Sequence, residues 1–232
     1  MNPSFALLTA LGAPLPVPLL DSLSRANFKP AAIIIDGKVP DSGLAIFRAR
    51  IDPTYIVRDL TDVHVGDIPC YFVKDHNAEP SVRLARNLGV DYFLNAGTPR
   101  ILKADFLNIS KGVINAHPGL LPKYRGCTCV EWSIYNNDPV GASAHFMTTD
   151  IDAGPLIYGE SMQVKPGESY ETIRTRMIGH QVHVLVKALG ILSNPPASGF
   201  PDSEDGNYFR PIPEAALLEV KSRLLRGEYA SP

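Results

Sequence analysis

Short apolar runs alternate with segments of helical spacing along the first half of the chain. Each run has the length of a buried strand, and the segments between them carry apolar residues three or four positions apart, as amphipathic helices do. The runs predict strands over residues 5–8, 31–35, 69–73, 91–95 and 113–117. The intervening segments predict helices over residues 17–23, 79–87 and 104–109. Strands that alternate with helices in this way favour a mostly parallel sheet covered by helices on both faces.

The second half of the chain continues this pattern with longer helices. It predicts strands over residues 140–148 and 156–164, and helices over residues 127–136, 170–192 and 214–226. Residues 38–67 mix charges, Pro and Gly without a period, so we expect an irregular excursion with one short helix. We therefore expect an α/β, Rossmann-like domain over residues 1–196. Residues 197–232 are expected to form a polar linker (198–207) and a short helical C-terminal extension, which packs on the domain or on a partner subunit.

Polar residues at the end of the fifth predicted strand are the first candidates for chemistry. Asn115 and His117 close this strand, before a break at Pro118-Gly119. Because strand side chains alternate, the two side chains point to the same side of the sheet. Asp152 follows the next predicted strand, in a polar loop that ends at Ala153-Gly154-Pro155. Ligands of parallel sheets bind beyond the carboxyl ends of the strands. An amide, an imidazole and a carboxylate at that edge can stabilise an oxyanion and move a proton.

The same residues resemble the motifs of a known family, the folate-dependent formyltransferases. The family pattern is Asn-x-His-Pro-(Ser/Gly)-Leu-Leu-Pro, then an aromatic residue with (Arg/Lys)-Gly, then Asp-(Ala/Thr/Gly)-Gly. This chain carries the three pieces in order, as Asn115 to Pro122, Tyr124-Arg125-Gly126 and Asp152-Ala153-Gly154. A lone Asn-x-His at a strand end, or a lone Asp-Ala-Gly turn, is more often structural. Their conjunction with Leu-Leu-Pro and Tyr-Arg-Gly is what indicates catalysis.

The resemblance implies transfer of a formyl group from N10-formyltetrahydrofolate, as co-substrate, to an amine, without a metal. Residues 1–196 would then be the catalytic domain. Asn115 and a protonated His117 would donate hydrogen bonds to the tetrahedral oxygen that develops during transfer. Asp152 would hold His117 in its charged form and relay a proton from the amine.

The resemblance also implies where the ligands bind. In the family the pterin ring is held largely by backbone groups, and the matching positions here are Leu94, Asn95, Ala96, Met147, Thr148, Thr149 and Asp150. Candidates for substrate binding lie near the reacting centre, at Gly119, Lys123, Tyr124 and Arg125. Lys123 and Arg125 can pair with a phosphate or with the folate glutamate tail, or they can be solvated charges after a proline turn.

The remaining histidines and the cysteines indicate no further site. We expect His145 to pack or to hydrogen-bond within its strand, and His64 and His76 to lie on the surface. His180 and His183 are three positions apart, but no other metal-type residues cluster near them. We expect buried positions for the small or aromatic residues of the helix over 127–136, which are Cys127, Cys129, Trp132 and Tyr135.

Composition narrows the class of protein. The 232 residues are 45% hydrophobic and 20% charged, with a formal net charge of −2. This is typical of soluble globular proteins and shows no basic excess for binding nucleic acid. No apolar run is long enough to span a membrane, and the N-terminus lacks the basic start of a secretory signal. Three cysteines cannot form a paired disulfide framework, so we expect a reduced, cytoplasmic protein.

Sequence differences from members of the resembled family limit the choice of amine acceptor. The purine-pathway enzyme has a Gly-rich loop after its first strand that cradles a phosphate, whereas the matching loop here contains Pro14 and Pro16, which have no N–H. The tRNA enzyme carries a further C-terminal domain, for which this chain leaves little room after Asp152, and the acidic balance disfavours tRNA. We therefore expect a small-molecule amine, and favour the amino group of a nucleotide-linked amino dideoxysugar, as in the sugar N-formyltransferases.

Other acceptors and functions stay open at this stage. An amino-acid-derived amine, such as hydroxyornithine, competes with the sugar. With water as the acceptor the protein would be a formyltetrahydrofolate hydrolase, and a non-catalytic folate-binding protein would keep the same fold. The apolar C-terminal helix also makes a homodimer a hypothesis.

Overall fold

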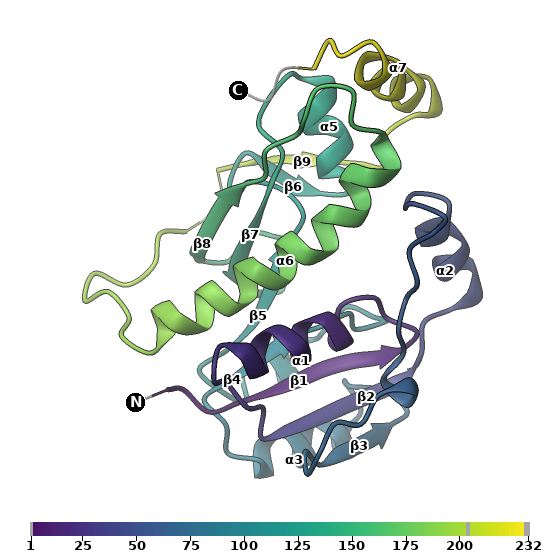
Figure 1. Cartoon of the computed structure of the whole chain (residues 1–232). Coiled ribbons are helices and arrows are strands. Elements are labelled where there is room, and N and C mark those ends of the chain that lie inside the picture. The colour runs from purple at the N-terminus through teal and green to yellow at the C-terminus, as the bar shows by residue number, and fades with distance from the viewer. Residues whose placement is uncertain (1, 203–204, 230–232) are drawn as a thin grey trace.

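The structure is a computed structural model that describes residues 2–202 and 205–229. Its centre is a seven-stranded sheet in the order β3-β2-β1-β4-β5-β7-β8 (Figure 1). The strands span Phe5–Leu11 (β1), Ala32–Lys38 (β2), Cys70–Val73 (β3), Tyr92–Asn95 (β4), Gly112–His117 (β5), Gly141–Phe146 (β7) and Leu156–Ser161 (β8). Neighbours from β3 to β5 are parallel, whereas β7 and β8 pair antiparallel. The prediction of a mostly parallel sheet is confirmed.

Helices connect most of these strands, except β7 and β8, and two more helices follow β8. They span Pro16–Arg25 (α1), Asp41–Arg48 (α2), Glu79–Asn87 (α3), Ala104–Leu107 (α4), Cys129–Tyr135 (α5), Tyr170–Leu192 (α6) and Glu214–Leu225 (α7), with a 3-10 turn at Leu60–Asp62 (η1). The long helix α6 has the predicted bounds, and the Ser169 hydroxyl caps it by accepting the Thr172 N–H at 3.1 Å. The excursion over residues 38–67 holds α2 and η1, joined by irregular backbone.

Both faces of the sheet are covered, because each strand of its parallel part buries alternate side chains on opposite sides. Leu7 of β1 belongs to the apolar cluster that contains α1 and α6, which lie together over one face (Figure 1). Leu8, the next residue, belongs to a second cluster that contains Val82 of α3 and Phe106 of α4. Two layers of helix therefore enclose the sheet, as the sequence predicts.

The C-terminal extension is tied to the domain by a strand as well as a helix. β9 (Asn207–Phe209) pairs in parallel with β6 (Tyr124–Gly126) in a separate two-stranded sheet. Only Asn207 of the predicted linker (198–207) belongs to this strand, and the sequence left Tyr208 and Phe209 unassigned because a three-residue strand is too short to leave a pattern. Residues 203–204 and 230–232 lie outside the described part. α7 packs against α5 and α6, with Val220 and Leu224 buried. Leu218 and Leu225 of α7 are exposed, and the homodimer stays a prediction.

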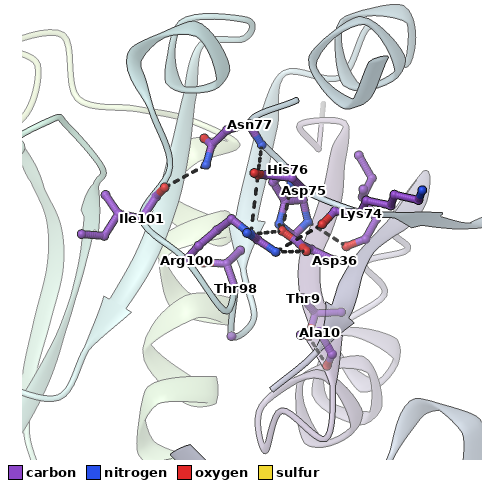
Figure 2. Close-up of polar contacts among 12 residues, drawn as sticks. Thr9, Ala10, Asp36, Lys74, Asp75, His76, Asn77, Thr98, Arg100 and Ile101 are labelled. Atoms are coloured by element: carbon purple, nitrogen blue, oxygen red, sulfur yellow. Dashed lines mark hydrogen bonds and ion pairs between the residues drawn. The ribbon is translucent and has the colours of Figure 1, made fainter. Parts of the chain in front are cut away.

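Three positions differ from the sequence expectations. His64 is exposed as predicted, but the His76 side chain is fully buried, because the segment after β3 folds back against β2 (Figure 2). The polar residues next to His76 in the sequence predicted an exposed position instead. Cys129 of α5 is buried, but Cys127, which precedes this helix, is exposed, and Tyr135 is 36% exposed rather than in the core.

The sheet order also fixes where a ligand can bind. β1 lies between β2 and β4. After β1 the chain first adds β2 and β3 on one side of this strand, and then adds β4 and β5 on the other side. A crevice forms beyond the carboxyl ends of the strands at such a switch point. Asn95 ends β4 and His117 ends β5, so both predicted segments reach this edge.

Candidate active site

Three polar side chains lie side by side on neighbouring strands at this edge. Asn115 of β5 is in register with Asn95 of β4 on one side and with His145 of β7 on the other. The Asn95 Nδ2 group donates to Asn115 Oδ1 at 3.0 Å, and Asn115 Nδ2 lies 3.3 Å from His145 Nε2. His145 Nδ1 is 3.0 Å from the Phe146 carbonyl, which can only accept, so Nδ1 carries a proton. These contacts fix the orientation of the Asn115 amide.

His117 is held between a backbone carbonyl and a carboxylate. Its Nε2–H donates to the Tyr124 carbonyl at 2.8 Å, and its Nδ1 lies 3.2 Å from Asp152 Oδ2. A Cβ atom on Gly119 would lie 2.7 Å from Nε2, so only glycine leaves room for this ring. Burial lowers the pKa of His117 below its ordinary value, although the Asp152 carboxylate opposes that shift. Because both ring nitrogens face protein oxygens, His117 acts on a ligand through Asp152 in this arrangement.

Asp152 joins the two histidines at the turn between β7 and β8. The Gly126 N–H donates to its Oδ2 at 2.9 Å, and its Oδ1 lies 3.5 Å from His145 Nε2. Burial acts to raise the pKa of Asp152, but the contact with His145, the His117 ring and the Gly126 N–H together bring it below its ordinary value. The residue is therefore a carboxylate at neutral pH. The structure thus brings Asn115, His117 and Asp152 together, and it adds His145 to them.

A cavity of about 340 Å³ opens over these residues. Asn115, His145 and Asp152 line it, while His117 lies behind Asp152 with a side chain 4% exposed. Most of the predicted pterin-binding positions line it too, namely Asn95, Met147, Thr148, Thr149 and Asp150. Leu94 and Ala96 are instead fully buried in and after β4. Another wall is the segment Thr98 to Leu102, which the sequence reasoning missed although it begins three residues after Asn95.

The predicted substrate-binding residues lie in different surroundings. Arg125 lines a second cavity, of about 420 Å³, with Tyr208 of β9 and the loop Thr149 to Ile151. Its Nη2 donates to the Ile151 carbonyl at 3.0 Å. Lys123 forms an ion pair with Asp138 at 2.7 Å, and the buried Tyr124 ring donates its hydroxyl to the same carboxylate. Gly119 is buried under His117. Only Arg125 of these four residues lines either cavity.

Other features of the described residues lie apart from this cluster. A larger cavity, of about 700 Å³, lies between α1 and the segment around residues 58–68 and contains none of the predicted site residues. Among residues 2–202 and 205–229, no three His, Cys, Asp or Glu side chains are grouped to hold a metal ion. Burial raises the pKa of the Cys129 thiol far above its ordinary value, so this thiol is unreactive. None of the helices in the described ranges combines the length and apolar character needed to cross a membrane.

Comparisons with known proteins agree with this geometry. A model of the formyl transferase family matches residues 60–189, which is more than half of the chain. Methionyl-tRNA formyltransferase from Alkaliphilus oremlandii is 29% identical over 157 residues, covering 63% of this chain and 50% of that protein. The chain therefore spans about half the length of this curated relative, and less of several others.

Solved structures share the fold at low sequence identity. Glycinamide ribonucleotide transformylase 1 from Symbiobacterium toebii aligns with a TM-score of 0.61 and 19% identity, covering 82% of this chain and 87% of that one. A sugar N-formyltransferase from a Shewanella species aligns with a TM-score of 0.57 and 19% identity, covering 90% of this chain and 77% of that one. These matches establish the architecture of the sheet and its helices.

Proposed function

Because the chain belongs to the formyl transferase family, we propose that it transfers a formyl group from N10-formyltetrahydrofolate to a primary amine. The observation that carries this proposal is the wall of the 340 Å³ cavity, where Asn115 and Asp152 lie together with His117 directly behind the carboxylate. An amide donor and a carboxylate–imidazole pair are the groups that acyl transfer to an amine requires.

The cavity fits a flat heterocycle with polar edges. Ile101, Leu102 and Met147 supply apolar surface, and Thr148, Thr149 and Asp150 supply polar groups. Small-molecule sites commonly combine apolar walls with a few fixed polar groups in this way, at volumes from about 300 Å³ upwards. The folate would supply the formyl group, and its ring system would lie against these two walls.

Asn115 stabilises the formyl oxygen as it gains negative charge. The contacts with Asn95 and His145 hold the amide before any ligand binds, so little reorganisation is needed during the reaction. A donor fixed in this way contributes about 3 to 4 kcal/mol of barrier lowering in a comparable acyl-transfer site.

Asp152 and His117 handle the proton that the attacking amine loses. Asp152 is ionised and faces the cavity, so it can take this proton directly or through a water molecule. His117 is in its neutral form at rest, with Nδ1 free to be protonated, and the Asp152 carboxylate stabilises the imidazolium that results. The pair can then return a proton to the leaving nitrogen.

For the acceptor we favour the amino group of a nucleotide-linked amino sugar. The loop after β1 does not offer a free cradle for a ribonucleotide phosphate, because Asp59 accepts the Gly12 N–H and Pro14 and Pro16 have no N–H. The 420 Å³ cavity reaches Ala153 beside Asp152 and places the Arg125 guanidinium and the Tyr208 ring in its walls. A cation and an aromatic face suit a diphosphate and a base.

A transfer assay with a panel of amines tests both levels of this proposal. The panel holds dTDP- and GDP-linked 3-amino and 4-amino dideoxysugars, hydroxyornithine and glycinamide ribonucleotide, with mass spectrometry of each product. A gain of one formyl group on a nucleotide sugar, abolished in Asn115→Ala, supports donor and acceptor together. Formylation of another amine overturns the acceptor alone. Formate released without any acceptor, or no use of the folate, overturns amine formylation.

A further inference from the structure

The wall of the donor cavity formed by Thr98 to Leu102 has no regular secondary structure of its own. It lies between β4 and α4, and Thr98, Pro99, Arg100, Ile101 and Leu102 all line the cavity. A loop in this place must be fixed by side-chain contacts if the cavity is to keep one shape. Figure 2 shows that such contacts come from the end of β2 and from the segment Lys74 to Asn77.

The Arg100 guanidinium is the first contact. Its Nε donates to Asp36 Oδ2 at 2.6 Å and its Nη2 donates to Asp36 Oδ1 at 2.7 Å, which makes a two-point ion pair (Figure 2). The Asp36 side chain is fully buried at the end of β2, and the His76 N–H donates to the same Oδ2 at 2.9 Å. Burial acts to raise the pKa of Asp36, but Arg100 and the His76 N–H outweigh it and keep the group ionised. A buried carboxylate with three donors is a rigid anchor.

Asn77 is the second contact, on the other side of the same loop. Its Nδ2 donates to the Ile101 carbonyl at 3.0 Å, and its Oδ1 accepts the Lys103 N–H at 2.7 Å. The Lys74 carbonyl accepts from Arg100 Nη2 at 3.2 Å. The segment 74–77 thus holds residues 100–103 from both ends, and the buried His76 ring fixes that segment by approaching the Ile34 carbonyl at 3.2 Å.

We propose that Asp36, Arg100 and Asn77 are positioning residues that hold the Thr98–Leu102 wall of the cavity in the shape that binds the formyl donor. This inference rests on the proposed function for the identity of the ligand. It assigns the three residues to donor affinity, whereas the chemical step stays with Asn115, His117 and Asp152. The Arg100 guanidinium acts through its ion pair with Asp36 and does not contact the donor itself.

The test measures donor KM, kcat and tetrahydrofolate binding by calorimetry for Asp36→Asn, Arg100→Lys and Asn77→Ala. We expect KM for the donor and Kd for tetrahydrofolate to rise about tenfold in each, since each loses one or two charge-assisted or backbone hydrogen bonds. The value of kcat at saturating donor should change less than about threefold. Hydrogen exchange of the amides of residues 97–103 should become faster in the same variants, and this rate reports on the stability of the loop in the absence of any ligand.

Controls separate the possible failures. Arg83→Lys alters a guanidinium that pairs with Glu79 on the exposed side of α3, and it should change none of these values. If Asp36→Asn keeps or improves donor affinity while Arg100→Lys weakens it, Arg100 binds the donor directly and the positioning role is overturned. Unchanged affinity in all three variants overturns it too, as does an unchanged exchange rate. A wild-type protein that binds no tetrahydrofolate overturns the proposed function, whereas the exchange result still decides whether the three residues hold the loop.

Discussion

Two buried histidines in this protein, His117 and His76, have almost the same surroundings. Each has Nε2 near a backbone carbonyl, at 2.8 Å from Tyr124 and 3.2 Å from Ile34 respectively. Each has Nδ1 3.2 Å from an aspartate oxygen, of Asp152 in the first pair and Asp36 in the second. Burial lowers the pKa of both rings. Local geometry of the histidine therefore does not distinguish an active-site pair from a structural one.

The difference lies in what else each carboxylate contacts. Asp36 is fully buried and is neutralised by the two-point ion pair with Arg100. Within residues 2–202 and 205–229, Asp152 forms no ion pair with Arg or Lys, and its partners are the two histidines and the Gly126 N–H. It also lines the cavity. A carboxylate that is paired with Arg holds structure, and one that is paired only with histidine and open to a ligand can exchange protons.

Exchanging each aspartate for asparagine gives the largest expected contrast. Asp152→Asn removes the proton acceptor at the cavity, so kcat should fall about 10³-fold, within the range of general acid–base catalysis. Asp36→Asn removes an anchor distant from the chemistry, so kcat at saturating donor should stay within about threefold of wild type. Steady-state kinetics on both variants checks this. A comparable loss of kcat in the two variants would mean that the pairs do not differ in role.

Removing the amide donor should have the next largest effect. Asn115→Ala leaves the His117–Asp152 pair intact but takes away the N–H that stabilises the developing oxyanion, so kcat should fall about 10²- to 10³-fold. The control is Asn77→Ala, an amide deletion of the same size that belongs to the His76 side of the molecule and should act on donor KM. Single-turnover rates at saturating donor separate the two effects, and equal rates in Asn115→Ala and wild type would remove Asn115 from the mechanism.

Crowding the active pair without changing its charges should have a moderate effect. In Gly119→Ala the new methyl group would lie 2.7 Å from His117 Nε2 and 2.8 Å from the Tyr124 carbonyl, so the ring must move and its hydrogen bond must weaken. We expect kcat to fall about tenfold, as expected for a small displacement of a catalytic group. Gly179→Ala on α6, where a methyl group meets nothing within 4 Å, is the matched control. Full activity in Gly119→Ala would show that the position of His117 is not critical.

The parts of this site that the sequence predicts are those set by local pattern. Strand alternation places Asn115 and His117 on one side, and apolar spacing gives α6 its observed bounds. His145 meets Asn115 only through the antiparallel register of β5 with β7, which no local pattern encodes. Asp36 meets Arg100 across 64 positions of sequence, and neither residue stands in a motif. The contacts that define the second pair are long-range and irregular, so the sequence could not show them.

The smallest expected effect is on the pH dependence of stability, and it tests whether His76 is neutral like His117. With a pKa below its ordinary 6.5 in the folded state, each ring binds a proton more readily when unfolded. Stability should therefore fall as the pH drops below about 6.5, by at most about 1.4 kcal/mol per pH unit for each histidine. The pKa values of Asp36 and Asp152 lie below 3.8, so their contributions are present throughout pH 5 to 7.

Urea unfolding of His76→Gln across pH 5 to 7 should show a slope smaller by up to that amount, because the glutamine amide can still donate to the Ile34 carbonyl but does not titrate. An unchanged slope in His76→Gln would mean that His76 has the same pKa in the folded and the unfolded protein. A steeper slope in the variant would mean that Asp36 keeps His76 protonated in the folded protein, and the two pairs would then differ in charge as well as in surroundings.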